Sequence, residues 1–249
     1  MNENTLQRYI TGFVLLGAAI LLVLINSFFV TWAVLGLVYL IAFREACKLF
    51  ATDNTAIYVL ALGMWIVAGF LASPEYLGIL VVVILVSMMA HKKEFDAALL
   101  KPFLYPTLSM LFMLSLYANY GMIALVWLVL IVGMTDTGAY MVGKSFGKTP
   151  FSPTSPNKTW EGVAGGVALA SVVGALFGMA TLGFFGALLV SFFTSLASVW
   201  GDLFESFLKR EADVKDSGSI FPGHGGMLDR VDGYLFGVIV LFILLNIFV

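Results

Sequence analysis

Residues 121–142 read GMIALVWLVLIVGMTDTGAYMV, and this run decides the class of fold. Asp136 is the only charged residue in it. A helix needs about 20 mostly apolar residues to cross the roughly 30 Å hydrocarbon layer of a membrane. Every backbone amide in that layer must be hydrogen-bonded within the protein, and a helix achieves this. The run therefore predicts a membrane-spanning helix.

Further apolar segments lie on both sides of this run, near residues 9–25, 28–43, 56–73, 76–90, 102–118, 160–179, 182–203 and 232–249. Of the 249 residues, 61% are hydrophobic and 11% are charged, whereas about 25% are charged in an ordinary soluble domain. The mean hydropathy is +1.00. We expect an all-α integral membrane protein, a polytopic bundle of about nine transmembrane helices that forms one domain over residues 1–249.

All 13 basic residues fall on one side of this arrangement. They are Arg8, Arg44, Lys48, Lys92, Lys93, Lys101, Lys144, Lys148, Lys158, Lys209, Arg210, Lys215 and Arg230. Lys and Arg accumulate in cytoplasmic loops, so the N-terminus is predicted inside and the C-terminus outside. The protein is expected in the cell membrane as a multi-pass protein.

Two classes of function are excluded by composition. The net charge of −2 and the lack of a basic stripe exclude a nucleic-acid partner. Cys47 is the single cysteine, so neither an intramolecular disulfide nor a CxxC site can form, and no redox role is indicated.

The most polar stretch follows the segment at 182–203. Residues 206–232 read SFLKREADVKDSGSIFPGHGGMLDRVD, which combines cations, carboxylates and glycines. Gly223, Gly225 and Gly226 allow backbone conformations and close approaches that suit N–H groups aimed at phosphate oxygens. The stretch therefore predicts a phosphate-binding loop beside the membrane.

Three aspartates are the candidate catalytic residues and metal ligands. Asp229 and Asp232 are three residues apart, hence on one face of a helix. Asp202 shares a helix face with Glu205 and Lys209 in the same way. Neighbouring carboxylates repel unless a cation joins them, and hard oxygen ligands favour Mg²⁺. We expect one or two divalent ions at Asp202, Asp229 and Asp232, and a monovalent ion is compatible with the same ligands.

The candidate substrate contacts lie in the same third of the chain. Asp136 interrupts an apolar span, and Asn157 with Lys158 could hold phosphate or a base edge. The full set is Asp136, Lys144, Ser155, Asn157, Lys158, Ser206, Lys209, Arg210, Lys215, His224, Gly225 and Gly226. The active site is thus predicted within about residues 121–249, with residues 1–120 supplying N-terminal helices.

The run from Ser206 to Asp232 resembles the complete signature of the phosphatidate cytidylyltransferase family, also called CDP-diacylglycerol synthases. The stretches SPNKTWEG at 155–162 and GDLFES at 201–206 resemble the same family, so the resemblance covers roughly residues 130–249. It implies that CTP and phosphatidate react to CDP-diacylglycerol and pyrophosphate with a divalent metal. It also implies membrane lipids as partners, a cytoplasmic active site and a homodimer.

Other interpretations of these residues stay open. Asp229 and Asp232 could cap a helix and pair with Arg230, Asp202 could form an interhelical ion pair, and Asp136 could make a structural hydrogen bond. Among functions, a CTP-dependent lipid kinase would transfer the γ-phosphate to a lipid alcohol. A cation transporter would also use intramembrane acids, but nearer the bilayer midplane and on several helices.

Overall fold

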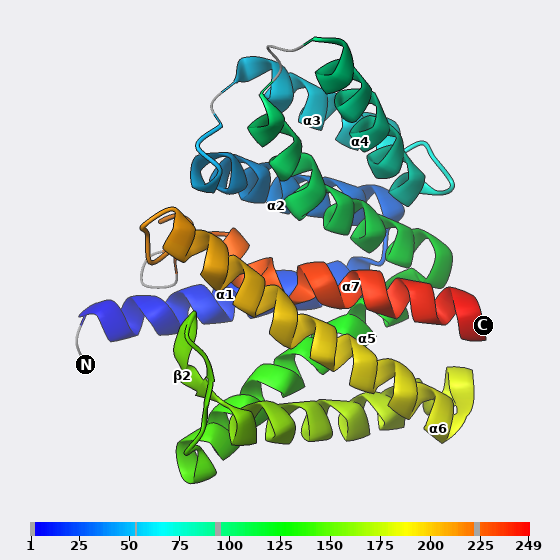
Figure 1. Ribbon diagram of the computed structural model, residues 1–249. Helices are drawn as coiled ribbons and strands as arrows, with labels where there is room; N and C mark the ends of the chain where they lie inside the picture. The colour runs from blue at the N-terminus through cyan, green and yellow to red at the C-terminus, as the bar shows by residue number, and fades with distance from the viewer. Residues whose placement is uncertain (1–2, 53, 93–95, 222–224) are drawn as a thin grey trace. The chain divides into compact units, whose positions relative to one another are not determined.

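The computed structural model describes residues 3–52, 54–92, 96–221 and 225–249, and in these it is almost entirely helical (Figure 1). The elements in chain order are α1 (Glu3–Ile25), α2 (Phe28–Leu49), α3 (Thr55–Ala68), α4 (Pro74–His91), η1 (Ala97–Leu100), η2 (Phe103–Thr107), α5 (Leu108–Phe146), β1 (Pro150–Ser152), β2 (Ser155–Thr159), α6 (Trp160–Glu211) and α7 (Leu228–Phe248).

Five helices of the described chain are long and apolar enough to cross a membrane: Phe28–Leu49, Pro74–His91, Ala97–Phe146, Trp160–Glu211 and Leu228–Phe248. Helices α5 and α6 are each interrupted by one glycine with a positive φ, Gly121 in α5 and Gly183 in α6. Gly183 leaves more than about 20 residues on each side, enough for two crossings. The predicted class of helical membrane protein is confirmed, whereas the count of nine spans and the sides of the termini stay predictions.

The chain divides into two compact units. The N-terminal unit comprises Met1–Met122 and Glu211–Arg230, and the C-terminal unit comprises Ile123–Arg210 and Val231–Val249. Predicted site residues occur in both units.

Aromatic side chains form the core of the N-terminal unit. The indole nitrogens of Trp32 and Trp65 each donate to the other residue's carbonyl oxygen, at 3.0 and 3.2 Å. The ring centroids of Tyr39 and Trp65 lie 5.1 Å apart, and those of Phe43 and Phe103 lie 5.3 Å apart. These contacts fasten α3 and η2 to α2.

Small residues let the helices of the C-terminal unit approach closely. A Cβ added to Gly138 of α5 would lie 2.9 Å from the Cα of Gly166 in α6, which real Cβ atoms do not tolerate. The Thr135 and Ser195 hydroxyls are hydrogen-bonded at 2.7 Å, again joining α5 to α6. Small residues and buried hydroxyls of this kind are typical of helix packing in membranes.

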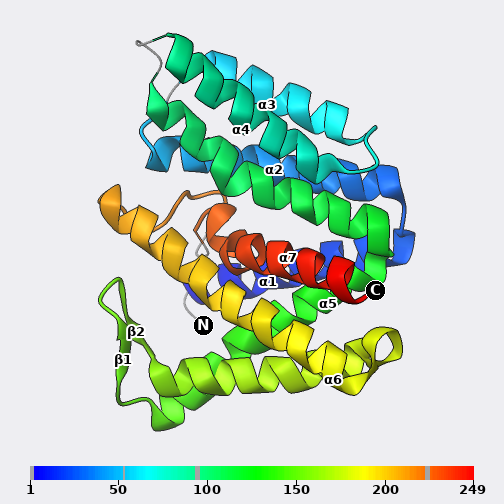
Figure 2. The same cartoon turned by 45° about the vertical axis from the view of Figure 1, so that its right-hand side comes forward.

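Two local structures differ from the predictions. Residues 150–159 form an antiparallel hairpin, β1 and β2, between the end of α5 and the start of α6 (Figure 2), whereas an all-α fold without strands was expected. Helix α6, which turns back on itself, continues to Glu211 rather than ending near residue 203. Its last turns remain helical because Leu208 and Glu205 are buried on one face, so Asp202, Ser206 and Lys209 project from a helix.

Candidate active site

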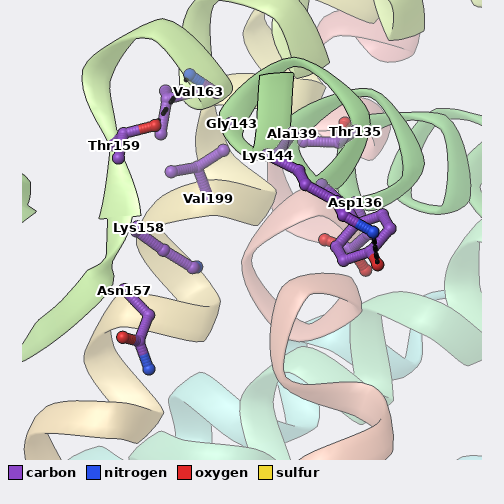
Figure 3. A pocket seen from close by; sticks show the side chains of 12 residues that line it. Thr135, Asp136, Ala139, Gly143, Lys144, Asn157, Lys158, Thr159, Val163 and Val199 are labelled. Carbon is purple, nitrogen blue, oxygen red and sulfur yellow. Dashed lines mark hydrogen bonds between the residues drawn. The ribbon is translucent and has the colours of Figure 1, made fainter. Parts of the chain in front are cut away.

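A cavity of about 440 Å³ lies in the C-terminal unit, and we call it the polar cavity because charged and polar side chains form part of its lining. Figure 3 shows its lining, which comes from α5, β2 and both arms of α6. The lining residues are Thr135, Asp136, Ala139, Tyr140, Gly143, Lys144, Asn157, Lys158, Thr159, Gly162, Val163 and Val199. Small-molecule sites typically enclose roughly 300–1,000 Å³. Four predicted substrate contacts, Asp136, Lys144, Asn157 and Lys158, therefore share one cavity of suitable size.

The hairpin brings a cation against a predicted metal ligand. Lys158 lies on β2, and its ammonium group forms an ion pair with the Asp202 carboxylate of α6. The two side chains are 26% and 29% exposed, so both remain accessible to a ligand. Asp202 thus forms an ion pair, but with a residue of strand β2 rather than with a second helix, and this partner itself lines the cavity.

Glu161 fastens the hairpin to the start of α6. Its carboxylate accepts hydrogen bonds from the backbone N–H groups of Lys148 and Thr149, both at 3.2 Å, and from the Thr149 hydroxyl at 2.8 Å. The Trp160 N–H donates to the Thr149 carbonyl at 3.0 Å. These contacts hold the strand that carries Lys158 at the edge of the cavity.

The opposite wall of the cavity is the last part of α5. Lys144 donates to the Tyr140 hydroxyl at 3.4 Å, and its Nζ atom lies 5.6 Å from the centre of the Tyr140 ring. Asp136 is exposed on the same helix. A cation and an acid from α5 therefore line the cavity together with Lys158.

Carboxylates of α5, α6 and α7 gather in this unit. Asp232 interacts electrostatically with Asp202 and Asp136, and its side chain is hydrogen-bonded to Glu205. Glu205 is fully buried and accepts a hydrogen bond from Lys209 at 3.3 Å. Nearby carboxylates destabilise one another's charged form, so this cluster favours a bound cation.

Asp229 lies in the N-terminal unit, where it orders the loop before α7. We call residues 212–227 the α6–α7 loop. The Asp229 Oδ2 atom accepts hydrogen bonds from the Ser217 N–H and hydroxyl, both at 2.9 Å, and from the Gly226 N–H at 2.7 Å. Gly225 has φ +80°, a conformation that favours glycine. One of the predicted phosphate-loop glycines, Gly226, is thus held by the Asp229 carboxylate.

Glu45 also contacts this loop, and the sequence reasoning missed it. It belongs to α2 and accepts hydrogen bonds from the N–H groups of Met227 and Leu228 at 3.0 and 2.8 Å. An acid within a membrane-spanning segment is a functional candidate by default. The predicted apolar segment ends at residue 43, but α2 continues to Leu49, so extending the predicted span by one turn and applying that signal could have identified Glu45.

The other predicted contacts are placed as follows. Ser206 donates to Asp202 at 3.4 Å, and Ser155 begins β2 without lining the cavity. Arg210 is exposed in the last turn of α6, and Lys215 is exposed in the α6–α7 loop. His224 lies outside the described residues.

A comparison with protein families decides the relationship. The model of the family described as "Cytidylyltransferase family" matches residues 6–248. The chain belongs to this family. The match extends over the N-terminal helices, for which the sequence motifs carried no signature.

Named relatives agree with the family match. The chain is 44% identical over 242 residues to "Phosphatidate cytidylyltransferase" from Helicobacter pylori, covering 96% of this chain and 91% of the relative. It is 46% identical over 134 residues to the protein of that name from Bacillus subtilis, covering 52% of this chain and 50% of the relative. "Phosphatidate cytidylyltransferase 4, chloroplastic" from Arabidopsis thaliana is 46% identical over 106 residues, covering 41% of this chain and 27% of the relative.

Proposed function

We propose that this chain is a membrane-embedded phosphatidate cytidylyltransferase, which converts CTP and phosphatidate into CDP-diacylglycerol and pyrophosphate. The observation that carries the proposal is the 44% identity to a relative of that name over 96% of this chain. The cations and carboxylates of the polar cavity support it independently, because two polyanions must be brought together for this reaction.

An apolar groove beside the polar cavity supports a lipid substrate. It encloses about 890 Å³ between the two arms of α6, and its lining is almost entirely hydrophobic. Val163 lines both the groove and the polar cavity. An amphipathic molecule fits such a pair of adjoining sites, with its phosphate in the cavity and an acyl chain in the groove.

The proposed reaction is a direct displacement at phosphorus. An oxygen of the phosphatidate phosphate attacks the α-phosphorus of CTP, and a new P–O bond forms as the bond to the β-phosphate bridging oxygen breaks. The electron pair leaves with pyrophosphate. A phosphate dianion is already nucleophilic, so no general base is required. Lys144, Asn157 and Lys158 would bind the phosphate oxygens and stabilise the developing charge.

The residues present fit a magnesium ion. Among the described residues no three His, Cys, Asp or Glu side chains converge into a metal cage. Mg²⁺, however, is usually held by one or two carboxylates together with waters and substrate phosphates. Asp202 and Asp232, whose carboxylates interact, suit that pattern, and Asp229, three residues earlier on α7, is the third proposed ligand. When bound, the ion would neutralise charge on the triphosphate and on the leaving pyrophosphate.

We further propose that the active site faces the cytoplasm and that the enzyme forms a homodimer. The one-sided distribution of basic residues supports the orientation, since Lys144, Lys158 and Lys209 belong to the side rich in cations. The homodimer is an expectation from the family resemblance.

Pyrophosphate release from the purified protein tests the proposed function. Release should require phosphatidate and Mg²⁺ together, and CTP should be preferred over ATP, GTP and UTP. Diacylglycerol in place of phosphatidate is the matched control and should give no pyrophosphate. Release that is independent of phosphatidate, or formation of CDP without pyrophosphate, would contradict the proposal.

A further inference from the structure

We propose that Glu45 is a positioning residue of the reaction, which acts by holding the α6–α7 loop in the conformation that carries Asp229 and the glycines of the signature. The predicted effect of Glu45 on the reaction rate rests on the proposed cytidylyltransferase function, whereas the predicted effect of Glu45 on the loop conformation does not. Glu45 lies 172 residues before Ser217 in the sequence. It stands in the half of the chain where sequence motifs indicated only hydrophobic spans.

The Glu45 carboxylate contacts the α6–α7 loop at Ser217 and at its junction with α7. Its Oε1 atom accepts a hydrogen bond from the Met227 N–H at 3.0 Å, and its Oε2 atom accepts from the Leu228 N–H at 2.8 Å. Oε2 also lies 3.1 Å from the Ser217 hydroxyl oxygen. Glu45 is 6% exposed, so these partners replace water around a buried charge. The side chain therefore ties the loop to α2 at Ser217 and at its C-terminal end.

The contact with Leu228 also fixes where α7 begins. Leu228 is the first residue of α7, and the first four N–H groups of a helix have no partner within the helix. An anionic group at this end is further stabilised by the helix dipole. Because Asp229 and Asp232 lie in the first turns of α7, a defined helix start determines where their carboxylates project.

Ser217 connects Glu45 to Asp229. The Ser217 hydroxyl lies 3.1 Å from the Glu45 carboxylate and 2.9 Å from the Asp229 carboxylate. The Ser217 N–H donates to Asp229 as well. Glu45 and Asp229 thus both contact Ser217, so the position of the Glu45 carboxylate influences that of the Asp229 carboxylate.

Two glycines of the signature pack directly on Glu45. A Cβ added to Gly218 or to Gly226 would overlap the Glu45 carboxylate. Gly226 was predicted as a phosphate contact. Its backbone also gives the Glu45 side chain the space to reach the loop, which is a second reason for glycine at this position.

Glu45→Gln, with Glu75→Gln as its matched control, tests the proposal. Glutamine keeps the size of Glu45 but replaces one acceptor oxygen with a donor that faces backbone N–H groups. Glu75 is an equally buried acid of the same unit, 5% exposed in α4, and its carboxylate accepts from Ser115 in α5. Hydrogen exchange of peptides covering residues 215–221 and 225–230 is measured in the full-length protein, with kcat and KM for CTP.

Glu45→Gln should accelerate exchange at Met227 and Leu228 and lower kcat/KM by about 10–10²-fold, because small displacements of positioned groups have effects of this size. Glu75→Gln should leave both measurements unchanged even where it lowers the melting temperature. Ser217→Ala should cause a smaller change, and the double variant Glu45→Gln/Ser217→Ala should be non-additive because the residues are in contact.

Wild-type exchange and wild-type kcat/KM in Glu45→Gln would overturn the proposal. So would faster loop exchange with normal kcat/KM, or an equal loss of kcat/KM in Glu75→Gln. If Glu45→Gln is not recovered in folded form, Ser217→Ala, which removes only one hydroxyl, is judged by the same two measurements, loop exchange and kcat/KM. If the wild-type protein does not turn over phosphatidate, the proposed function fails, while the exchange measurement still decides whether Glu45 holds the loop.

Discussion

Replacing Lys158 with alanine removes the cation that β2 brings to the polar cavity. Its ion pair with Asp202 is about a quarter exposed on each side. Ion pairs in such surroundings contribute about 0–1 kcal/mol to stability. For a chain of this length, 1 kcal/mol corresponds to a change in melting temperature of about 2–4 °C. The substitution should therefore lower the melting temperature by a few degrees at most.

The effect of Lys158→Ala on activity should be much larger. A hydrogen bond to a charged group contributes about 1.5–3 kcal/mol, which corresponds to about 10–10²-fold in kcat/KM. The same phosphate contact exists in the ground state and in the transition state, so the loss should appear mainly as a higher KM for CTP. Lys148→Ala is the matched control, because Lys148 is exposed two residues before the hairpin and does not line the cavity.

Initial rates across a CTP titration at saturating phosphatidate and Mg²⁺, combined with a thermal-shift curve, separate these effects. Lys158→Ala should show a raised KM with nearly normal stability, and Lys148→Ala should resemble the wild-type protein. An unchanged KM for CTP in Lys158→Ala would refute the phosphate contact. An equal rise in both variants would show that only the general charge of the surface matters.

Three further predictions concern the acids, the hairpin and the orientation in the membrane. Asp202→Asn and Asp232→Asn should each lower turnover at saturating Mg²⁺ by about 10²-fold or more without a matching thermal shift. The double variant should have the same turnover as the single variants. Near-normal turnover in either single variant would remove that residue from the proposed metal ligands. Glu161→Ala should speed limited proteolysis of the hairpin and raise the KM for CTP, since three hydrogen bonds are lost, and unchanged cleavage would count against this role. A reporter fused after Val249 should lie outside the cytoplasm and one at Ser155 inside; cytoplasmic activity of the Val249 fusion would require an even number of crossings.

Apolar runs predicted the helices well, because a membrane segment must satisfy its own backbone within a limited length. They could not locate the elements that depend on contacts from elsewhere. The stretch 150–159 contains Pro150, Pro153 and Pro156 and therefore reads as a loop, yet it forms a hairpin, and Thr149 just before it donates hydrogen bonds to Glu161. Helix α6 extends beyond the apolar run 182–203, because Glu205 and Leu208 in its last turns are buried on one face.

The types of site residue were predictable, but their partners were not. Local spacing identified Lys158 and Asp202 separately, and only the folding of the hairpin onto α6 shows that they form an ion pair. Glu45 escaped notice because it stands in an apolar segment far from every motif. Its significance depends on contacts with backbone N–H groups of the α6–α7 loop, which no side-chain pattern reveals.

The fate of each CTP phosphate is the most direct test of the central claim that the protein transfers a cytidylyl group to phosphatidate. Purified protein is incubated with phosphatidate, Mg²⁺ and CTP labelled at either the α- or the γ-phosphate, and the lipid and aqueous products are separated. The α-label should enter the lipid as CDP-diacylglycerol, and the γ-label should be released as pyrophosphate. Transfer of the γ-label to a lipid, or no labelled lipid from α-labelled CTP, would contradict it.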